Sequence, residues 1–244
     1  FRPIHCSGEP AVPAFDCKPA MIRQTSPVAH CPIKRHHALW AAVLCAAGFL
    51  TVWLMVDTGA AEGIDRIGLL FWRSGPALGP RGPYWLTETA RTLTALGDIV
   101  PRNLLAIAAA AALIWIGLRR EAAYFAVTVV GAWLAEWVIK LAVGRPRPNI
   151  VPHLADAGGP GFPSGHSFNS AAIYIAMALA FAALSSRRAL RATLVGGAVA
   201  LSILIAFSRV WLGVHYPTDA AAGWLGGAAW AFSAAALQAG QRKP

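Results

Sequence analysis

The chain has 244 residues, of which 57% are hydrophobic and 13% charged, and its formal net charge is +10. Soluble domains carry about 25% charged residues, so this composition excludes an ordinary soluble protein and predicts an integral membrane protein. The basic residues are scattered between apolar runs and do not form one basic face, so the net charge does not indicate nucleic-acid binding.

Residues 1–37 are rich in Pro, Ser, His and Cys and show no sustained hydrophobic periodicity. We expect them to form a disordered cytoplasmic tail. The chain begins with Phe1, and Met21 is a candidate start of translation. The cysteines lack the C-x2-C spacing of zinc sites, so the sequence predicts neither a metal site nor a disulfide framework.

Six apolar segments have a length suited to crossing a bilayer, which takes about 20 residues of helix. They are Ala38–Val56, Val100–Leu118, Ala122–Val143, Ser167–Leu184, Ala192–Phe207 and Thr218–Leu237. The sequence therefore predicts an all-α bundle of six transmembrane helices over residues 38–240. A signal peptide is the alternative for the first segment, but its apolar run and the leader before it are too long.

Residues 57–100 mix charged, Gly/Pro-rich and apolar stretches. Leu69–Trp72 and a helix around residues 86–96 are too short to span a membrane and would suit its interface. We expect this region to be a packed lid or spacer, with a substrate-facing role as the alternative.

Basic residues recur at alternate ends of the predicted spans. They are Lys34, Arg35, Arg119, Arg120, Arg187, Arg188, Arg191, Arg242 and Lys243. Cytoplasmic loops carry an excess of Lys and Arg, so both termini are predicted to be cytoplasmic. The same alternation places residues 140–166 and 209–219 together on the outer side.

The most informative polar cluster lies between the last two apolar segments. It consists of Ser208-Arg209, then His215 after five residues, then Asp219 after three more. Charged groups are costly near a bilayer and usually mark a functional site there. Pro217 suits the first turn of a helix, so Asp219 would hold one ring nitrogen of His215 and leave the other free as base or nucleophile. Simple capping of membrane segments by Arg209 and His215 is the alternative.

Two further motifs contain residues suited to binding an anion. Pro163-Ser164-Gly165-His166 directly precedes an apolar segment, so the backbone N–H groups at that helix start would face an anion. Upstream, Lys140 follows another apolar segment.

Arg147-Pro148 lies seven residues after Lys140. On an ideal helix Arg147 shares the face of Lys140, whereas Arg145 points away. Glu136 precedes Lys140 by four positions, which predicts an ion pair on one helical face; a proton relay through Glu136 is the alternative.

In this order and spacing, the three motifs resemble the signature of the type 2 phosphatidic acid phosphatase family, and every position of that pattern is matched. The resemblance implies that His215 is the nucleophile, that His166 protonates the leaving group and that Asp219 orients His215. It also implies a phosphate-binding set without a metal or cofactor. The members of that set are Lys140, Arg147, Ser164, Gly165 and Arg209.

These features together predict a membrane-embedded phosphatase that acts on a phosphorylated lipid at the outer face of a bacterial inner membrane. The resemblance suggests phosphatidate, phosphatidylglycerol phosphate, undecaprenyl diphosphate or a lipid A phosphate, and the short loop 149–162 favours an isoprenyl diphosphate. No nucleic-acid partner is expected. The alternatives are a lipid phosphotransferase with the same site, a soluble vanadate haloperoxidase, which the spans disfavour, and a non-catalytic transporter or scaffold.

Overall fold

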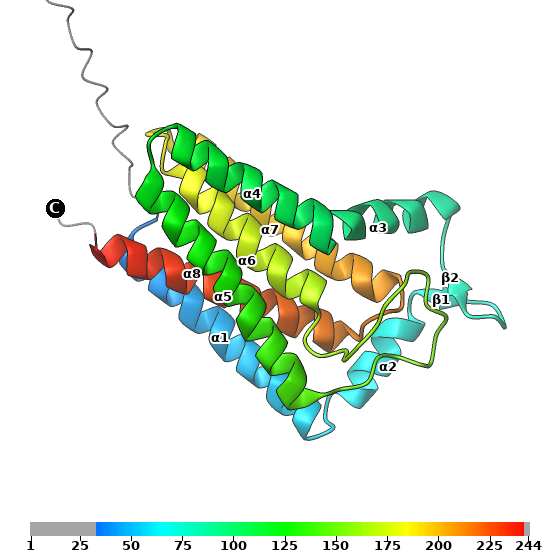
Figure 1. The fold of residues 1–244 in the computed structure, drawn as a ribbon. Helices are drawn as coiled ribbons and strands as arrows, with labels where there is room; N and C mark the ends of the chain where they lie inside the picture. Colours follow the sequence, from blue (N-terminus) through cyan, green and yellow to red (C-terminus); the bar gives the residue numbers. More distant parts are fainter. Residues whose placement is uncertain (1–32, 242–244) are drawn as a thin grey trace, which may run out of the picture.

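A computed structural model of the protein describes residues 33–241, so the tail predicted for residues 1–37 lies almost entirely outside the described part. The helices are α1 (Arg35–Asp57), α2 (Glu62–Leu70), α3 (Tyr84–Gly97), α4 (Ile99–Trp115), α5 (Arg119–Val143), α6 (Gly165–Ala182), α7 (Arg188–Trp211) and α8 (Pro217–Gln241). Two two-residue strands, β1 (Arg73–Ser74) and β2 (Gly79–Pro80), pair antiparallel between α2 and α3. The described chain is therefore helical, as predicted, apart from this short ladder (Figure 1).

Each of the six predicted apolar segments forms a long helix. Four of these helices, α1, α5, α7 and α8, are long and apolar enough to cross a membrane, and α3 with α4, bent by 50° at their junction, gives up to a fifth span. Helix α6 has 18 residues, but its first turns carry His166, Ser167, Asn169 and Ser170, which lower its hydropathy. The predicted count of six spans therefore stays a prediction.

Helix α6 lies in the middle of the bundle, between α5, α7 and α8 (Figure 1). Close approach of α8 depends on glycine, because a Cβ at Gly227 would collide with the carbonyl of Phe168 and one at Gly223 would lie 2.6 Å from the carbonyl oxygen of Ser164. Small residues thus let α8 pack closely on α6. This packing brings the start of α6, with the second motif, against the start of α8, beside the third motif.

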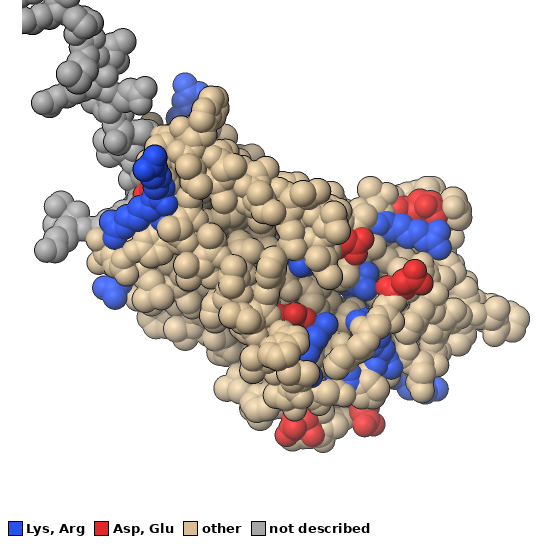
Figure 2. All heavy atoms as spheres, viewed as in Figure 1, with Lys and Arg blue, Asp and Glu red and all other residues tan. Residues whose placement is uncertain are grey.

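The two ends of the bundle differ in charge. Near one end, the side chain of Arg120 at the start of α5 donates to the Gln241 side chain at the end of α8, at 3.3 Å. Figure 2 shows Lys and Arg gathered at this end, whereas acidic and basic side chains mix at the opposite end. All three motifs lie at the opposite, mixed end.

The segment between α1 and α4 covers the motif-bearing end. Helix α2 packs on α8, and α3 packs on α7. Trp72, after α2, contacts Phe207 and Trp211 of α7 with ring centroids 5.2 Å apart in both pairs. This segment is therefore packed, as predicted, and its role as a lid, a spacer or a substrate-facing element stays a prediction.

Candidate active site

Six of the eight predicted site residues line one cavity of about 580 Å³ at the motif-bearing end. They are Lys140, Arg147, Gly165, His166, Arg209 and His215. The other two, Ser164 and Asp219, are fully buried and do not line the cavity. The structure thus brings together residues from α5, the loop after it, α6, α7 and the α7–α8 loop.

His215 is buried at the base of the cavity. Its Nε2 lies 2.8 Å from Nη1 of Arg147, and a guanidinium can only donate, so Nε2 accepts this hydrogen bond and the proton of the neutral imidazole is on Nδ1. Burial lowers the pKa of His215 well below its ordinary value, and the positive charges of Arg147, Arg209 and Lys140 lower it further. The imidazole is therefore neutral at pH 7, with the lone pair of Nε2 toward the cavity.

Asp219 lies behind His215 in the first turn of α8, where Pro217 is the first helical residue, as predicted. The distance from Nδ1 of His215 to Oδ2 of Asp219 is 3.6 Å, which is longer than a hydrogen bond. Oδ2 instead accepts from the backbone N–H of Tyr216 at 3.0 Å. The carboxylate is near enough to favour a proton on Nδ1 electrostatically, and its own position is held by neighbouring groups.

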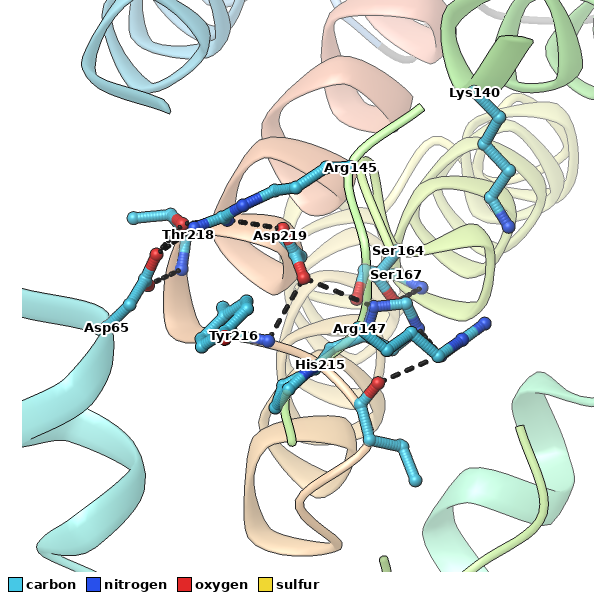
Figure 3. A network of polar contacts seen from close by, with 12 residues as sticks. Asp65, Lys140, Arg145, Arg147, Ser164, Ser167, His215, Tyr216, Thr218 and Asp219 are labelled. Atoms are coloured by element: carbon cyan, nitrogen blue, oxygen red, sulfur yellow. Dashed lines mark hydrogen bonds and ion pairs between the residues drawn. The ribbon is translucent and has the colours of Figure 1, made fainter. Parts of the chain in front are cut away.

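The principal such group is Arg145, which lies between two buried carboxylates (Figure 3). Its Nη1 is 2.7 Å from Oδ1 of Asp219, and its Nη2 is 2.7 Å from Oδ2 of Asp65 in α2. Burial alone would lower the pKa of Arg145, but the two carboxylates outweigh it and raise the pKa. Asp65 also accepts from the backbone N–H and the hydroxyl of Thr218, at 2.9 Å and 2.7 Å.

Arg147 lines the cavity and Arg145 does not, as predicted, but the helical spacing is not the reason. Helix α5 ends at Val143, and Gly144 has left-handed backbone angles, so the helical spacing used to compare positions 145 and 147 does not apply. Both arginines extend from a non-helical segment, and their side chains approach the site from opposite sides. Arg145 contacts Asp219 from behind, and Arg147 contacts His215 from the cavity.

Arg147 crosses the cavity from the α5–α6 loop. Besides the contact with His215, its guanidinium donates to the carbonyls of Gly158, Gly159 and Val214 at 2.8, 3.1 and 2.9 Å. Burial lowers the pKa of Arg147, and Asp219 partly opposes this shift. These neutral acceptors do not cancel the charge of Arg147, which leaves it able to bind an anion.

His166 is the second residue of α6 and pairs with a residue that the motifs do not include. Its Nε2 is 2.6 Å from Oδ1 of Asp98, which occupies the single position between α3 and α4. A carboxylate accepts hydrogen bonds, so this contact places a proton on Nε2. The two histidines therefore differ in the cavity: Nε2 of His215 is an acceptor and Nε2 of His166 is a donor.

The remaining cations are held by residues from α3 and α5. Arg209 donates from Nη1 to the hydroxyl of Thr94 at 2.6 Å. Lys140 lies 3.0 Å from Oε1 of Glu136, which confirms the predicted pair. A Cβ at Gly165 would approach this carboxylate to 2.7 Å, so a side chain there would displace the Glu136–Lys140 pair.

Ser164 is the N-cap of α6. Its hydroxyl accepts from the backbone N–H of Ser167 at 3.5 Å, and its own N–H donates to the carbonyl of Asp219 at 3.0 Å. The prediction that the second motif begins a helix is confirmed. Ser164 thus joins the starts of α6 and α8.

Asp65, Thr94 and Asp98 were missed in the sequence because they belong to no motif and lie 40 or more residues from the groups they contact. Asp98 carried a local signal, since an Asp directly before an apolar helical run is a common N-cap. Asp65 carried a weaker sequence signal, because it is an acidic residue within a short apolar stretch. Neither signal predicts which motif residue is the partner.

Loss of the Asp65 carboxylate is expected to destabilise the protein strongly. Asp65 is only 1% exposed, and removing one partner of a buried ion pair typically costs about 3–5 kcal/mol. Asp65→Ala should therefore lower the melting temperature in detergent by many degrees. Glu62→Ala is the matched control, because Glu62 lies exposed on the same helix and exposed substitutions usually change stability by less than about 0.5 kcal/mol. Equal melting of the two variants would contradict a structural role for the Asp65–Arg145 pair.

Comparison with known proteins adds independent evidence. The chain is 33% identical over 108 residues to the undecaprenyl-diphosphatase of Bacillus subtilis, covering 41% of this chain and 49% of that protein. It is 33% identical over 118 residues to the lipid A 1-phosphatase of Rhizobium etli, covering 45% and 44%. With phosphatidylglycerophosphatase B of Bacillus subtilis it shares 30% identity over 185 residues, covering 72% and 83%. The alignments thus span about half the length of the first two relatives and most of the third.

A solved structure has the same fold. The crystal structure of a transmembrane PAP2-type phosphatidylglycerolphosphate phosphatase from Bacillus subtilis matches with a TM-score of 0.71 and 22% identity, over 84% of this chain and 98% of that one. The family model of the PAP2 superfamily matches residues 120–243, a range that includes all three motifs and both histidines of the cavity. The chain therefore belongs to the PAP2 superfamily.

Proposed function

We propose that the protein is an integral membrane phosphatase that hydrolyses a phosphomonoester or diphosphate of a lipid through a phosphohistidine. The observation that carries this proposal is the cavity in which an acceptor nitrogen of His215, a donor nitrogen of His166 and three cations meet. Arginine and lysine side chains are the usual protein partners of phosphate, and the charge that develops in phosphoryl transfer is spread over three equatorial oxygens. Lys140, Arg147 and Arg209 provide one cation for each oxygen.

The first step is in-line attack by Nε2 of His215 on phosphorus. An N–P bond forms as the bond to the leaving oxygen breaks, and His166 in its imidazolium form gives that oxygen a proton and becomes neutral. The phosphate takes the place of His215 as a partner of Arg147, which frees the lone pair of Nε2. Asp219, held by Arg145, stabilises the positive charge that His215 gains. Water then hydrolyses the phosphohistidine, with His166 as the base.

The phosphate-binding set extends to Gly165 and Ser164 at the start of α6. Backbone N–H groups at a helix start favour anions, and the Gly165 N–H is placed there with the Ser164 hydroxyl close behind. Neither a metal nor a cofactor is required, because the cations and the two histidines supply the charge stabilisation, the nucleophile and the proton.

The test is phosphate release by the purified protein on a panel of lipid phosphates: phosphatidate, phosphatidylglycerol phosphate, a lipid A phosphate and an isoprenyl diphosphate. We expect turnover that persists in EDTA and is inhibited by vanadate, which mimics the trigonal-bipyramidal phosphoryl group. Appearance of the phosphoryl group on an added alcohol, without free phosphate, would identify a phosphotransferase. No turnover on any member would favour a non-catalytic scaffold and refute the proposal.

We propose further that the chain crosses a bacterial inner membrane six times, with α6 and the α3–α4 pair as the fifth and sixth spans and the site on the outer side. The support is that successive long helices run in alternating directions and that the basic residues gather at the end opposite the site (Figures 1 and 2). Excess Lys and Arg mark the cytoplasmic side.

Thiol labelling tests this orientation in a background without the natural cysteines. A Cys at Thr58, exposed after α1, should react with an impermeant reagent in intact spheroplasts, whereas a Cys at Ser186, exposed between α6 and α7, should react only after lysis. Thr58 is a better outer position than Gly159 in the α5–α6 loop, because the φ of +69° at Gly159 would strain any side chain placed there. The reverse labelling pattern would place the site in the cytoplasm.

The depressed pKa of His215 predicts an unusual pH profile. Since the free imidazole must be deprotonated to attack, the acid limb of kcat/KM should lie at the pKa of His215 in the free enzyme. Burial and the surrounding cations place this pKa below the ordinary value of about 6.5, so activity should persist into more acidic buffers. Monophosphate and diphosphate substrates should show the same acid limb, because it belongs to the enzyme. An acid limb at or above 6.5 would contradict a neutral, buried His215.

A further inference from the structure

A fourth cation lines the cavity and is not explained by the three motifs. Arg102, in the first turn of α4, is 5% exposed, and its Nη1 donates to the carbonyl of Gly97 at 2.8 Å. Its Nε has no hydrogen-bond partner within residues 33–241. A buried guanidinium in a membrane protein is costly and usually functional, and one hydrogen bond to a carbonyl does not neutralise its charge.

Other polar atoms around Arg102 are also unsatisfied. Trp133 Nε1, Asn103 Oδ1 and Asn169 Oδ1 are buried without hydrogen-bond partners in the described chain, and all three residues line the same cavity as Arg102. Buried polar groups are nearly always hydrogen-bonded to protein, water or a ligand. Two donors, Arg102 Nε–H and Trp133 Nε1–H, and two carbonyl acceptors from the asparagines therefore lie unpaired on residues that form the cavity wall.

Gly97 shows where the cluster of Arg102, Asn103, Trp133 and Asn169 lies relative to the catalytic His166. The same residue accepts the Arg102 hydrogen bond and packs against His166, since a Cβ at Gly97 would lie 3.1 Å from Cδ2 of the imidazole. Arg102 is also close enough for its charge to act on His166. The cluster therefore lies on the side of the cavity where His166 would meet the leaving group.

We propose that Arg102, with Trp133, Asn103 and Asn169, forms a second phosphate subsite that binds the leaving phosphate of a lipid diphosphate. The inference rests on the proposed function and specifies its substrate class. Attack by His215 on the terminal phosphorus breaks its bond to the bridging oxygen, which leaves on the lipid monophosphate with a proton from His166. Arg102 and Trp133 donate to the anionic oxygens of this leaving phosphate, and the asparagine carbonyls accept from its P–OH group.

The test compares two substrates that differ only in one phosphate, farnesyl diphosphate and farnesyl monophosphate. Hydrogen bonds to charged groups contribute about 1.5–3 kcal/mol, so Arg102→Met should lower kcat/KM on the diphosphate about 10- to 100-fold. On the monophosphate the loss should stay within about threefold. Pyrophosphate should inhibit the natural protein more strongly than orthophosphate does, and Arg102→Met should remove this difference. Arg91→Met, at an exposed arginine of α3 paired with Glu88, is the matched control.

Asn103→Leu provides a second variant if Arg102→Met does not fold. It should also lower kcat/KM on farnesyl diphosphate more than on farnesyl monophosphate, but by a smaller factor than Arg102→Met. Equal losses on both farnesyl substrates would overturn the subsite. A selective loss on phosphatidylglycerol phosphate would also overturn it, because the cluster would then bind glycerol hydroxyls. Turnover of the monophosphate but not the diphosphate by the natural protein would refute the inference alone, whereas no turnover of any lipid phosphate would refute the proposed function.

Discussion

Replacement of His215 by Ala is expected to abolish phosphate release from every substrate. The nucleophile forms the bond to phosphorus, and among the described residues lining the cavity no other side chain presents an unprotonated nitrogen to it. Lys140, Arg147 and Arg209 are cations, and His166 carries its Nε2 proton toward Asp98. Removal of the covalent nucleophile lowers kcat by about 10⁶-fold in a well-studied serine protease. We expect a loss of this order for His215→Ala, with KM little changed.

A covalent trap distinguishes this role from a structural one. Rapid quenching of the natural protein with a radiolabelled substrate should capture an acid-labile, alkali-stable phosphoenzyme, which His215→Ala should not form. His37→Ala, at an exposed histidine at the start of α1, is the control for folding and for labelling of other histidines. A phosphoenzyme of normal yield in His215→Ala would show that another residue is the nucleophile.

The sequence alone predicted those parts of the site that depend on short-range order. Pro217 and Asp219 occupy the first turn of α8 because a proline favours that position, and the second motif begins α6 because it directly precedes an apolar run. The pair of Glu136 and Lys140 follows from helical spacing. Long apolar runs likewise predicted six helices, since no soluble core would contain so many.

Long-range partners could not be predicted in this way. Asp65, Thr94 and Asp98 reach the site only because residues 58–98 fold back over the end of the bundle, and that packing depends on contacts such as those of Trp72 with α7. The contacts of Arg145 with Asp65 and Asp219 could not be predicted for a related reason: the helical projection assumed that α5 continues, whereas Gly144 ends it. Gly144 and Pro146 both disfavour a helix, but they do not indicate where the Arg145 side chain goes.

The free-energy cost of burying charges explains the role of the carboxylates that surround the site. Asp65 and Asp219 both pair with Arg145, Glu136 pairs with Lys140, and Asp98 pairs with His166. Asp98 is exposed, but each of the other groups would be expensive to bury unpaired. The carboxylates therefore keep the cationic site stable when it is empty, while Arg147 and Arg209, bound mainly to neutral acceptors, keep their charge available for phosphate.

The second large effect is expected from His166→Ala, and its size should depend on the leaving group. Nε2 of His166 carries a proton, held toward Asp98 at 2.6 Å, and the leaving oxygen would replace Asp98 as its acceptor. General acid catalysis contributes about 10²- to 10⁴-fold, so kcat/KM on an alkyl phosphomonoester should fall by that factor. A phenolate departs without a proton, so the loss on p-nitrophenyl phosphate should be much smaller.

A lipid diphosphate should fall between these two substrates, because its leaving phosphate is only moderately basic. The measurement is kcat/KM of the natural protein, His166→Ala and His215→Ala on all three substrates, after each variant has been shown to insert and to melt normally. Asp98→Asn is the matched variant for the partner of His166: it should reproduce the same order of losses at a smaller size, since the imidazole remains. Equal losses for His166→Ala on the alkyl and aryl esters would exclude His166 as the acid. A rescue of His215→Ala by good leaving groups would mean that the two histidines have exchanged roles.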